Sequence, residues 1–362
     1  MTAQSFLSPS YQYRMTLEKR FPTLFSQPHA REWLLEKASD LASNTVSAYG
    51  HALVDYFRFC AIRAINPPDA KRTDVRAYVT DLKSRSKFGM PARRPGYVKS
   101  TTHDGFANAT IRLRVTTVRL YYEYLIDEEV RTTNPIKIVK YKRGRGFNGN
   151  SRGMVERYEK DPWLPNETQW QALLNAASSE CIRNRFMLAL AYDTGVRRAE
   201  LCALETGDID PSQRLLHLRA KTTKSQRARQ VPYSQATGEL YAAYLQHRRR
   251  ISRAPGPLFL SESRRNKGLP ISFWTWSKVV KALGERAGLP LFTPHTLRHL
   301  RLTDLAQAGW KMAEIAALAG HVHPATTMIY VHISGRELSE RFRQTLDSTL
   351  DWRQETMQTS LQ

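Results

Sequence analysis

Residues 292–299, FTPHTLRH, predict the start of a helix that carries two functional side chains on one face. Thr293 suits the N-cap and Pro294 suits the first helical position, so His295 and Arg298 fall three residues apart in the first turn. A helix N-terminus favours an anion, and a guanidinium group can bind two phosphate oxygens at once. This segment therefore predicts a phosphate-binding site.

A second segment, TGVRRAEL at 194–201, predicts another anion site in outline. A glycine turn feeds a helix whose N-terminal end presents Arg197 beside free backbone N–H groups. Taken alone, the motif fits a surface arginine at a helix start better than it fits an anion site.

Two further segments follow near the end of the chain. AGH at 319–321 predicts a helix that ends at Gly320 and is followed by His321, and PATTMIYVH at 324–332 predicts a short helix with Tyr330 near its end. Most tyrosines are packed aromatics, so Tyr330 alone would not indicate catalysis.

In this order the four segments resemble the tyrosine recombinase, or phage integrase, family, whose signature is Arg, His-x-x-Arg, Gly-His and Tyr with these separations. The resemblance implies that Arg197 and Arg298 clamp a scissile DNA phosphate. It also implies that His295 and His321 donate hydrogen bonds to the phosphate and that Tyr330 attacks it. Glu200 stands three residues after Arg197, where the family keeps an acidic residue that supports the arginine.

The family uses a lysine on a hairpin turn as the acid for the departing 5′ hydroxyl. In the segment 219–225, RAKTTKS, Lys221 comes after the predicted strand, whereas Lys224 keeps the commoner distance to the Val-Pro pair at 231–232. We favour Lys221, because strand placement fixes a side chain better than loop length does. The other lysine is then a backbone phosphate contact.

The overall charge indicates a polyanionic partner. The chain has 55 Lys and Arg against 33 Asp and Glu, for a formal net charge of +22, and this favours double-stranded DNA over a solvated surface. No apolar run is long enough to span a membrane, and we expect a cytoplasmic, nucleoid-associated protein. The residues expected to contact DNA outside the catalytic set are Arg198, Lys140, Lys142, Arg143 and Arg145.

The predicted fold class is mainly α: an all-helical, SAM-like core-binding domain precedes an α+β catalytic domain with a small antiparallel sheet. Residues 215–219 and 228–232 predict the hairpin of that sheet. The predicted helices are 44–64, one capped at Thr73 or Asp74, 109–129, 164–177 capped at Asn166, 185–192, 235–248, 274–287, 296–308 and 312–319.

These elements predict five parts of the chain. They are an N-terminal extension (1–25), the core-binding domain (26–136), a basic linker (137–163), the catalytic domain (164–334) and a helical tail (335–362). The tail is expected either to pack on its own domain or to join neighbouring protomers. The resemblance implies a tetramer on DNA at synapsis and allows an accessory recombinase or DNA-bending protein.

No cofactor or metal ion is expected, because two guanidinium groups already stabilise the phosphate, and the isolated cysteines and remaining histidines lack ligand spacing. A type IB topoisomerase is one alternative, disfavoured by the resemblance of the first half, and a catalytically silent DNA-binding protein is another. Within the recombinase hypothesis we favour integration or transposition of a mobile element over dimer resolution, because of the extension and an insert at 88–102.

Arg298→Lys is predicted to keep the positive charge and DNA binding but to lose most DNA cleavage, because an ammonium group cannot form the two-pronged contact of a guanidinium group. A cleavage assay beside a DNA-binding assay measures both effects. Normal cleavage by this variant would refute the bidentate clamp.

Overall fold

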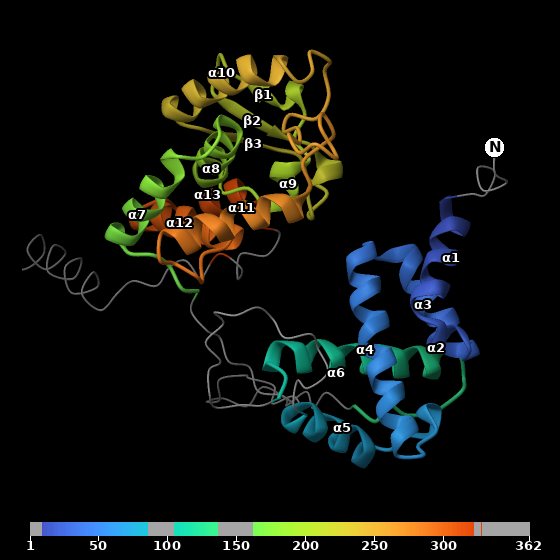
Figure 1. Cartoon of the computed structure of the whole chain (residues 1–362). Coiled ribbons are helices and arrows are strands. Elements are labelled where there is room, and N and C mark those ends of the chain that lie inside the picture. The colour runs from blue at the N-terminus through green and yellow to red at the C-terminus, as the bar shows by residue number, and fades with distance from the viewer. Residues whose placement is uncertain (1–8, 86–104, 137–161, 322–326, 328–362) are drawn as a thin grey trace, which may run out of the picture. The chain divides into compact units, whose positions relative to one another are not determined.

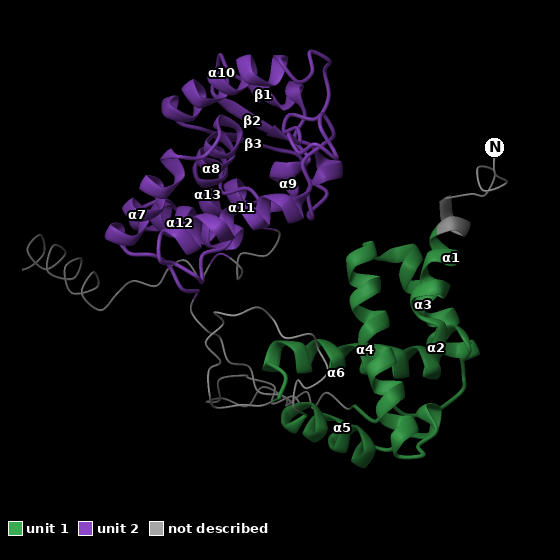
Figure 2. Cartoon of the chain, viewed as in Figure 1, with its two compact units in different colours: residues 1–159 green, residues 160–362 purple. Residues whose placement is uncertain are grey.

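The structure is a computed structural model that describes residues 9–85, 105–136, 162–321 and 327. The chain forms two compact units, Met1–Glu159 and Lys160–Gln362 (Figure 2). All described elements of the first unit are helical, and the second combines helices with a three-stranded antiparallel sheet (Figure 1). The predicted fold class is thus confirmed. The division falls inside the segment 137–163 expected to be a linker, and nearly all of that segment lies outside the described residues.

The first unit contains α1 (Pro9–Arg20), α2 (Pro22–Phe25), α3 (Pro28–Asp40), α4 (Ser43–Ile62), a 3-10 helix (Pro67–Asp69), α5 (Arg72–Ser84) and α6 (Asn108–Asp127). Residues 1–25 were expected to be an extension outside this domain, but Leu17, Phe21 and Leu24 are buried in its core. Leu17 lies on α1, Leu24 on α2 and Phe21 at the N-cap between them, so both helices contribute apolar side chains to this core.

The start of α5 differs from the predicted cap. Neither Thr73 nor Asp74 is the N-cap: the helix begins at Arg72, and the N-cap is Lys71. The carboxylate of Asp74 accepts the backbone N–H of Lys71 at 2.7 Å from inside the first turn. A carboxylate at the third helical position can accept a hydrogen bond from the N-cap amide. Asp74 therefore stabilises the N-terminus of α5 from within the helix rather than as its N-cap.

Asp55 on α4 joins three elements of the first unit. Its carboxylate accepts the Tyr78 hydroxyl of α5 at 2.8 Å and pairs with Arg85, just beyond α5, at 2.7 Å. It also pairs with Arg114 of α6, and the side chains of Asp55 and Arg114 are only 16% and 15% exposed. One carboxylate on α4 therefore links this helix to α5 and α6.

The second unit contains α7 (Glu167–Ser178), α8 (Ile182–Thr194), α9 (Arg198–Cys202), β1 (Ile209–Asp210), β2 (Leu215–Leu218), β3 (Arg229–Pro232), α10 (Gln235–Arg249), α11 (Phe273–Arg286), α12 (Pro294–Gln307) and α13 (Met312–Ala319). The predicted cap of α7 is confirmed, since Asn166 accepts the N–H of Gln169 at 2.9 Å. The hairpin is confirmed as β2 paired with β3, and β1 adds a short edge strand that the sequence did not predict.

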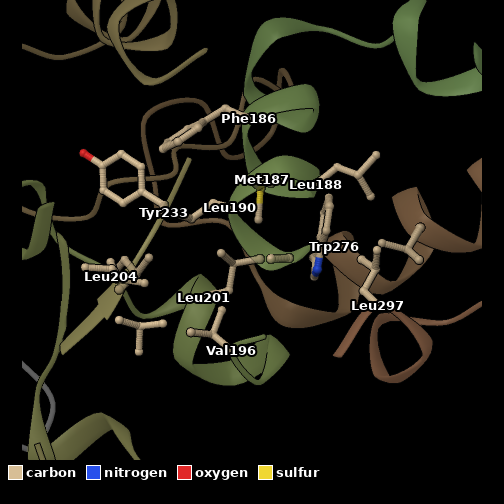
Figure 3. Close-up of a cluster of buried hydrophobic side chains, with 14 of the residues drawn as sticks. Phe186, Met187, Leu188, Leu190, Val196, Leu201, Leu204, Tyr233, Trp276 and Leu297 are labelled. Atoms are coloured by element: carbon tan, nitrogen blue, oxygen red, sulfur yellow. The ribbon is translucent and has the colours of Figure 1, made fainter. Parts of the chain in front are cut away.

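A single hydrophobic core fixes the helices of the second unit that bear the candidate site. Side chains from α8 fill its centre, with Leu201 of α9, Trp276 of α11 and Leu297 of α12 packed around them (Figure 3). Gly195 ends α8 in the left-handed conformation, with φ +57°. The turn from α8 into α9 is therefore set by a residue that tolerates positive φ. Among the described residues, no helix combines the length and apolar character needed to cross a bilayer.

Asp55→Ala is expected to lower the free energy of unfolding of the first unit by about 2 kcal/mol, because two guanidinium groups and a phenol lose their shared acceptor in a largely buried place. Hydrogen exchange of peptides from α4, α5 and α6 in the full chain measures this effect. Asp127→Ala, at an exposed position, is the matched control and should change exchange little. Equal protection in both variants would contradict the bridging role of Asp55.

Candidate functional site

Arg298 lies in the first turn of α12 and is buried, at 5% exposure. The predicted helix start is confirmed, since the Thr293 hydroxyl accepts the N–H of Thr296 at 3.2 Å. The guanidinium group of Arg298 donates through Nη1 to the carbonyl of Gly195 at 2.6 Å and through Nη2 to the carbonyl of Ala319 at 2.7 Å. Two carbonyls thus fix its plane.

Arg197 is the N-cap of α9 and is held by Glu200. Its Nη1 donates to Glu200 Oε1 at 2.9 Å, and its backbone N–H donates to the other carboxylate oxygen at 3.0 Å. Its Nη2 lies 3.4 Å from the carbonyl of Gly320. Arg298 contacts the carbonyl of the preceding residue, Ala319. Two arginines 101 positions apart in the sequence therefore meet at the end of α13.

His321 follows α13 directly and extends the cluster. Its Nε2 lies 2.9 Å from Nη2 of Arg298, and its Nδ1 lies 2.9 Å from the buried hydroxyl of Thr327. Because a guanidinium group can only donate, Nε2 accepts, and the neutral ring carries its proton on Nδ1 and donates it to Thr327. Donation from Nε2 to a phosphate, as the resemblance implies, requires a proton on Nε2, which either protonation of the ring or the other neutral tautomer, with Thr327 donating to Nδ1, supplies.

Burial and the surrounding cations keep His321 neutral. Partial burial and then the charges of Arg298, Arg197 and Arg229 lower the pKa of His321 to about 4. A bound phosphate would oppose these charges and raise the pKa of His321.

His295 and Arg198 lie beside the two arginines. Burial lowers the pKa of His295, and the charges of Arg198, Arg298 and Arg197 lower it further, although the ring is still accessible to solvent. Arg198 donates to the Ser277 hydroxyl at 3.0 Å, and its guanidinium lies over the rings of Phe273 and Trp274, 5.1 Å and 5.6 Å from their centroids. This expected DNA contact is therefore held against the start of α11.

The structure places both candidate lysines on the surface of the β2–β3 connection. Lys221 was expected directly after the strand, but β2 ends at Leu218, and Lys221 lies in a 3-10 helix at Ala220–Thr222. The argument from strand placement is therefore weakened. That short helix is closed by a hydrogen bond from the Thr222 N–H to the Arg219 carbonyl at 3.1 Å, whereas Lys224 lies in the turn beyond it. The choice between the two lysines stays open.

Several predicted residues lie outside the described part of the chain. They are Tyr330, Lys140, Lys142, Arg143 and Arg145, together with the tail at 335–362. Within the described ranges, no group of three or more His, Cys, Asp or Glu side chains is arranged to hold a metal ion.

Sequence reasoning missed one member of the cluster, Arg229. Its guanidinium group binds both oxygens of Glu200, at 2.7 Å and 3.3 Å, and its Nε donates to the carbonyl of Leu318 at 2.9 Å. The period of two along β3 could have indicated it, because Arg229 shares a face with the buried Val231.

Comparison with known proteins agrees with this geometry. Residues 165–337 match the sequence model of the phage integrase family. Tyrosine recombinase XerC of Herpetosiphon aurantiacus is 29% identical over 297 residues, which cover 81% of this chain and 86% of that protein. Residues 165–337 therefore form a phage integrase family domain, and the chain over most of its length is similar to tyrosine recombinases, enzymes of site-specific recombination.

Solved structures share the fold at low sequence identity. The Tn1549 transposon integrase in complex with transposon right end DNA has a TM-score of 0.64 at 16% identity, with 88% of this chain and 98% of that chain covered. The XerH site-specific recombinase bound to palindromic difH substrate has a TM-score of 0.62 at 16% identity, with 94% of each chain covered.

The pKa of His321 predicts a dependence of stability on pH. Between its ordinary value of 6.5 and the folded value of about 4, the unfolded chain binds a proton at this ring and the folded chain does not. The stability that the folded chain gains from keeping His321 neutral is therefore fully present above pH 6.5 and is lost as the pH falls toward 4. His295 and His299, whose pKa values are also lowered, add to the same slope.

Chemical denaturation at a series of pH values from 7 down to 5 tests this expectation. His321→Asn should lose less stability than the native chain over that range. Identical slopes for the two proteins would contradict the depressed pKa.

Proposed function

We propose that this recombinase binds double-stranded DNA and cleaves and rejoins one strand at a time through a 3′-phosphotyrosine bond at Tyr330. The supporting observation is the meeting of Arg197, Arg298 and His321 at the end of α13. Three side chains that bind anions, from three separate segments, define one place for a phosphate.

The clamp works by electrostatics. As the phosphate passes through a five-coordinate transition state, charge gathers on its non-bridging oxygens, and each fixed donor aimed there contributes about 2 to 4 kcal/mol. Arg298 is already oriented by the carbonyls of Gly195 and Ala319, and Arg197 by Glu200. Little reorganisation is then needed when the phosphate binds.

Proton transfers complete the reaction. An unperturbed phenol has a pKa of about 10, so the arginines must favour the phenolate of Tyr330, or a base must take its proton. His295 is the candidate base, because it is neutral near pH 7 and accessible. Lys221, or Lys224 in its place, protonates the departing 5′ hydroxyl. Rejoining to another 5′ hydroxyl needs no nucleotide, because the phosphotyrosine conserves the bond energy.

The chain's charge supports duplex DNA as the substrate, since a formal net charge of +22 favours a polyanion. Arg198 and the basic residues of the linker, Lys140, Lys142, Arg143 and Arg145, are proposed phosphate contacts. Four protomers joined through residues 335–362 are the proposed assembly at synapsis, with an accessory recombinase or DNA-bending protein as a further partner. A location at the nucleoid follows from this substrate.

Two biological roles fit the chemistry. The first is integration or transposition of a mobile element, supported by the insert at 88–102. The extension no longer supports it, because α1 and α2 contribute to the core of the first unit. The second is resolution of chromosome or plasmid dimers, which the XerC relative favours. Mapping the DNA bound by Tyr330→Phe protein in cells separates the two roles. Binding at the ends of a mobile element supports the first role, and binding at one site on the host chromosome or a plasmid supports the second.

Tyr330→Phe is expected to bind the target DNA normally and to form no covalent adduct, because the attacking oxygen is absent. Incubation with a nicked duplex that traps the cleaved intermediate measures the adduct. Tyr241→Phe, on α10, is the control and should form adduct as the native chain does. No adduct with the native chain would favour a catalytically silent DNA-binding protein, and an undiminished adduct with Tyr330→Phe would exclude this nucleophile.

A further inference from the structure

We propose that Arg229 is a positioning residue that holds Arg197, the end of α13 and the lysine-bearing hairpin in one arrangement. The inference rests on the proposed function, since it concerns the same phosphate site. Arg229 is placed outside contact with the phosphate and acts through the groups that it binds.

The contacts of Arg229 reach three elements. It is the first residue of β3 and pairs with Leu218, the last residue of β2, at the base of the connection that carries Lys221 and Lys224. Its guanidinium group binds Glu200 on α9 and the carbonyl of Leu318 on α13. One side chain, only 9% exposed, thus links the hairpin to the two elements that hold Arg197.

Glu200 passes the effect of Arg229 to Arg197. This carboxylate is 1% exposed and is shared between the two guanidinium groups. Burial alone would raise the pKa of Glu200, but the hydrogen bonds and charges of Arg229 and Arg197 outweigh it and lower the pKa. Two cations beside one anion leave a net positive charge. Without Arg229, the carboxylate would neutralise Arg197 and weaken its attraction for a phosphate.

Gly320 supplies the space that this arrangement needs. A Cβ atom added there would lie 2.8 Å from Nη1 and 3.0 Å from Cζ of Arg229, and the backbone has φ +64°. The glycine therefore lets α13 end in a left-handed turn while the guanidinium group of Arg229 packs against that turn. The same turn presents the Gly320 carbonyl to Arg197 and leads into His321.

A conservative substitution tests the role. Arg229→Lys keeps the charge but loses the forked contact with Glu200. We expect cleavage of a nicked duplex to be slower by roughly tenfold or more, because small displacements of a catalytic group are costly, while DNA binding changes by about twofold or less. Arg248→Lys is the matched control: Arg248 is also buried, at 4% exposure, but donates only to main-chain carbonyls between residues 252 and 258. Its cleavage rate should stay near the native rate.

A neutral substrate separates positioning from simple loss of stability. Replacing the scissile phosphate by a methylphosphonate removes the charge that Arg197 is held to bind, so the deficit of Arg229→Lys relative to the native chain should shrink. Arg229→Met lacks both the forked contact and the charge, so its cleavage of the phosphate substrate should be slower than that of Arg229→Lys. Its deficit relative to the native chain should likewise be smaller on the methylphosphonate. A deficit of equal size on both substrates would assign Arg229 a merely structural role.

The outcomes distinguish this inference from the proposed function. If the native chain forms the adduct and both Arg229 variants cleave at the native rate, the inference alone fails. If one Arg229 variant loses its folded circular dichroism spectrum, the cleavage rates of the other variant test the inference. If both variants fail to fold, a role confined to positioning is overturned. If the native chain forms no adduct, or Tyr330→Phe forms it undiminished, the proposed function fails first.

Discussion

The C-terminal carbonyls of α13 are the acceptors on which the site depends. Three successive carbonyls, of Leu318, Ala319 and Gly320, accept from Arg229, Arg298 and Arg197 in that order. The last carbonyls of a helix lack partners within it and lie at the negative end of its dipole, so they suit cationic donors. These carbonyls, together with the Glu200 carboxylate, hold close together three guanidinium groups that would otherwise repel one another.

Charge balance explains why this arrangement can also bind a phosphate. Glu200 is the carboxylate that pairs with Arg197 and Arg229, and Arg298 donates to the carbonyls of Gly195 and Ala319. Because Arg197 and Arg229 share this one carboxylate, the excess positive charge beside it favours entry of an anion. The neutral state of His321 belongs to the same balance, because the neighbouring guanidinium groups lower its pKa and an arriving negative group would raise it.

Local patterns were sufficient to predict most elements of the second unit, because caps, glycine turns and apolar periodicity act within a few residues. They succeeded at Asn166, Thr293 and Gly320, which stand where the sequence predicted. They failed for Arg229, whose partners are 29 and 89 positions away and become visible only in the folded chain. The predicted boundary at residue 26 left out Leu17, Phe21 and Leu24, which the fold buries in the core of the first unit. The roles of the catalytic residues, Tyr330 above all, stay predictions.

The most direct measurement is a crystal structure of the Tyr330→Phe protein bound to its mapped DNA site. The account predicts that guanidinium nitrogens of Arg197 and Arg298 lie within hydrogen-bonding distance of non-bridging oxygens of one and the same phosphate. It also predicts that residue 330 faces that phosphorus atom. Contacts of the two arginines with different phosphates, or with none, would contradict it.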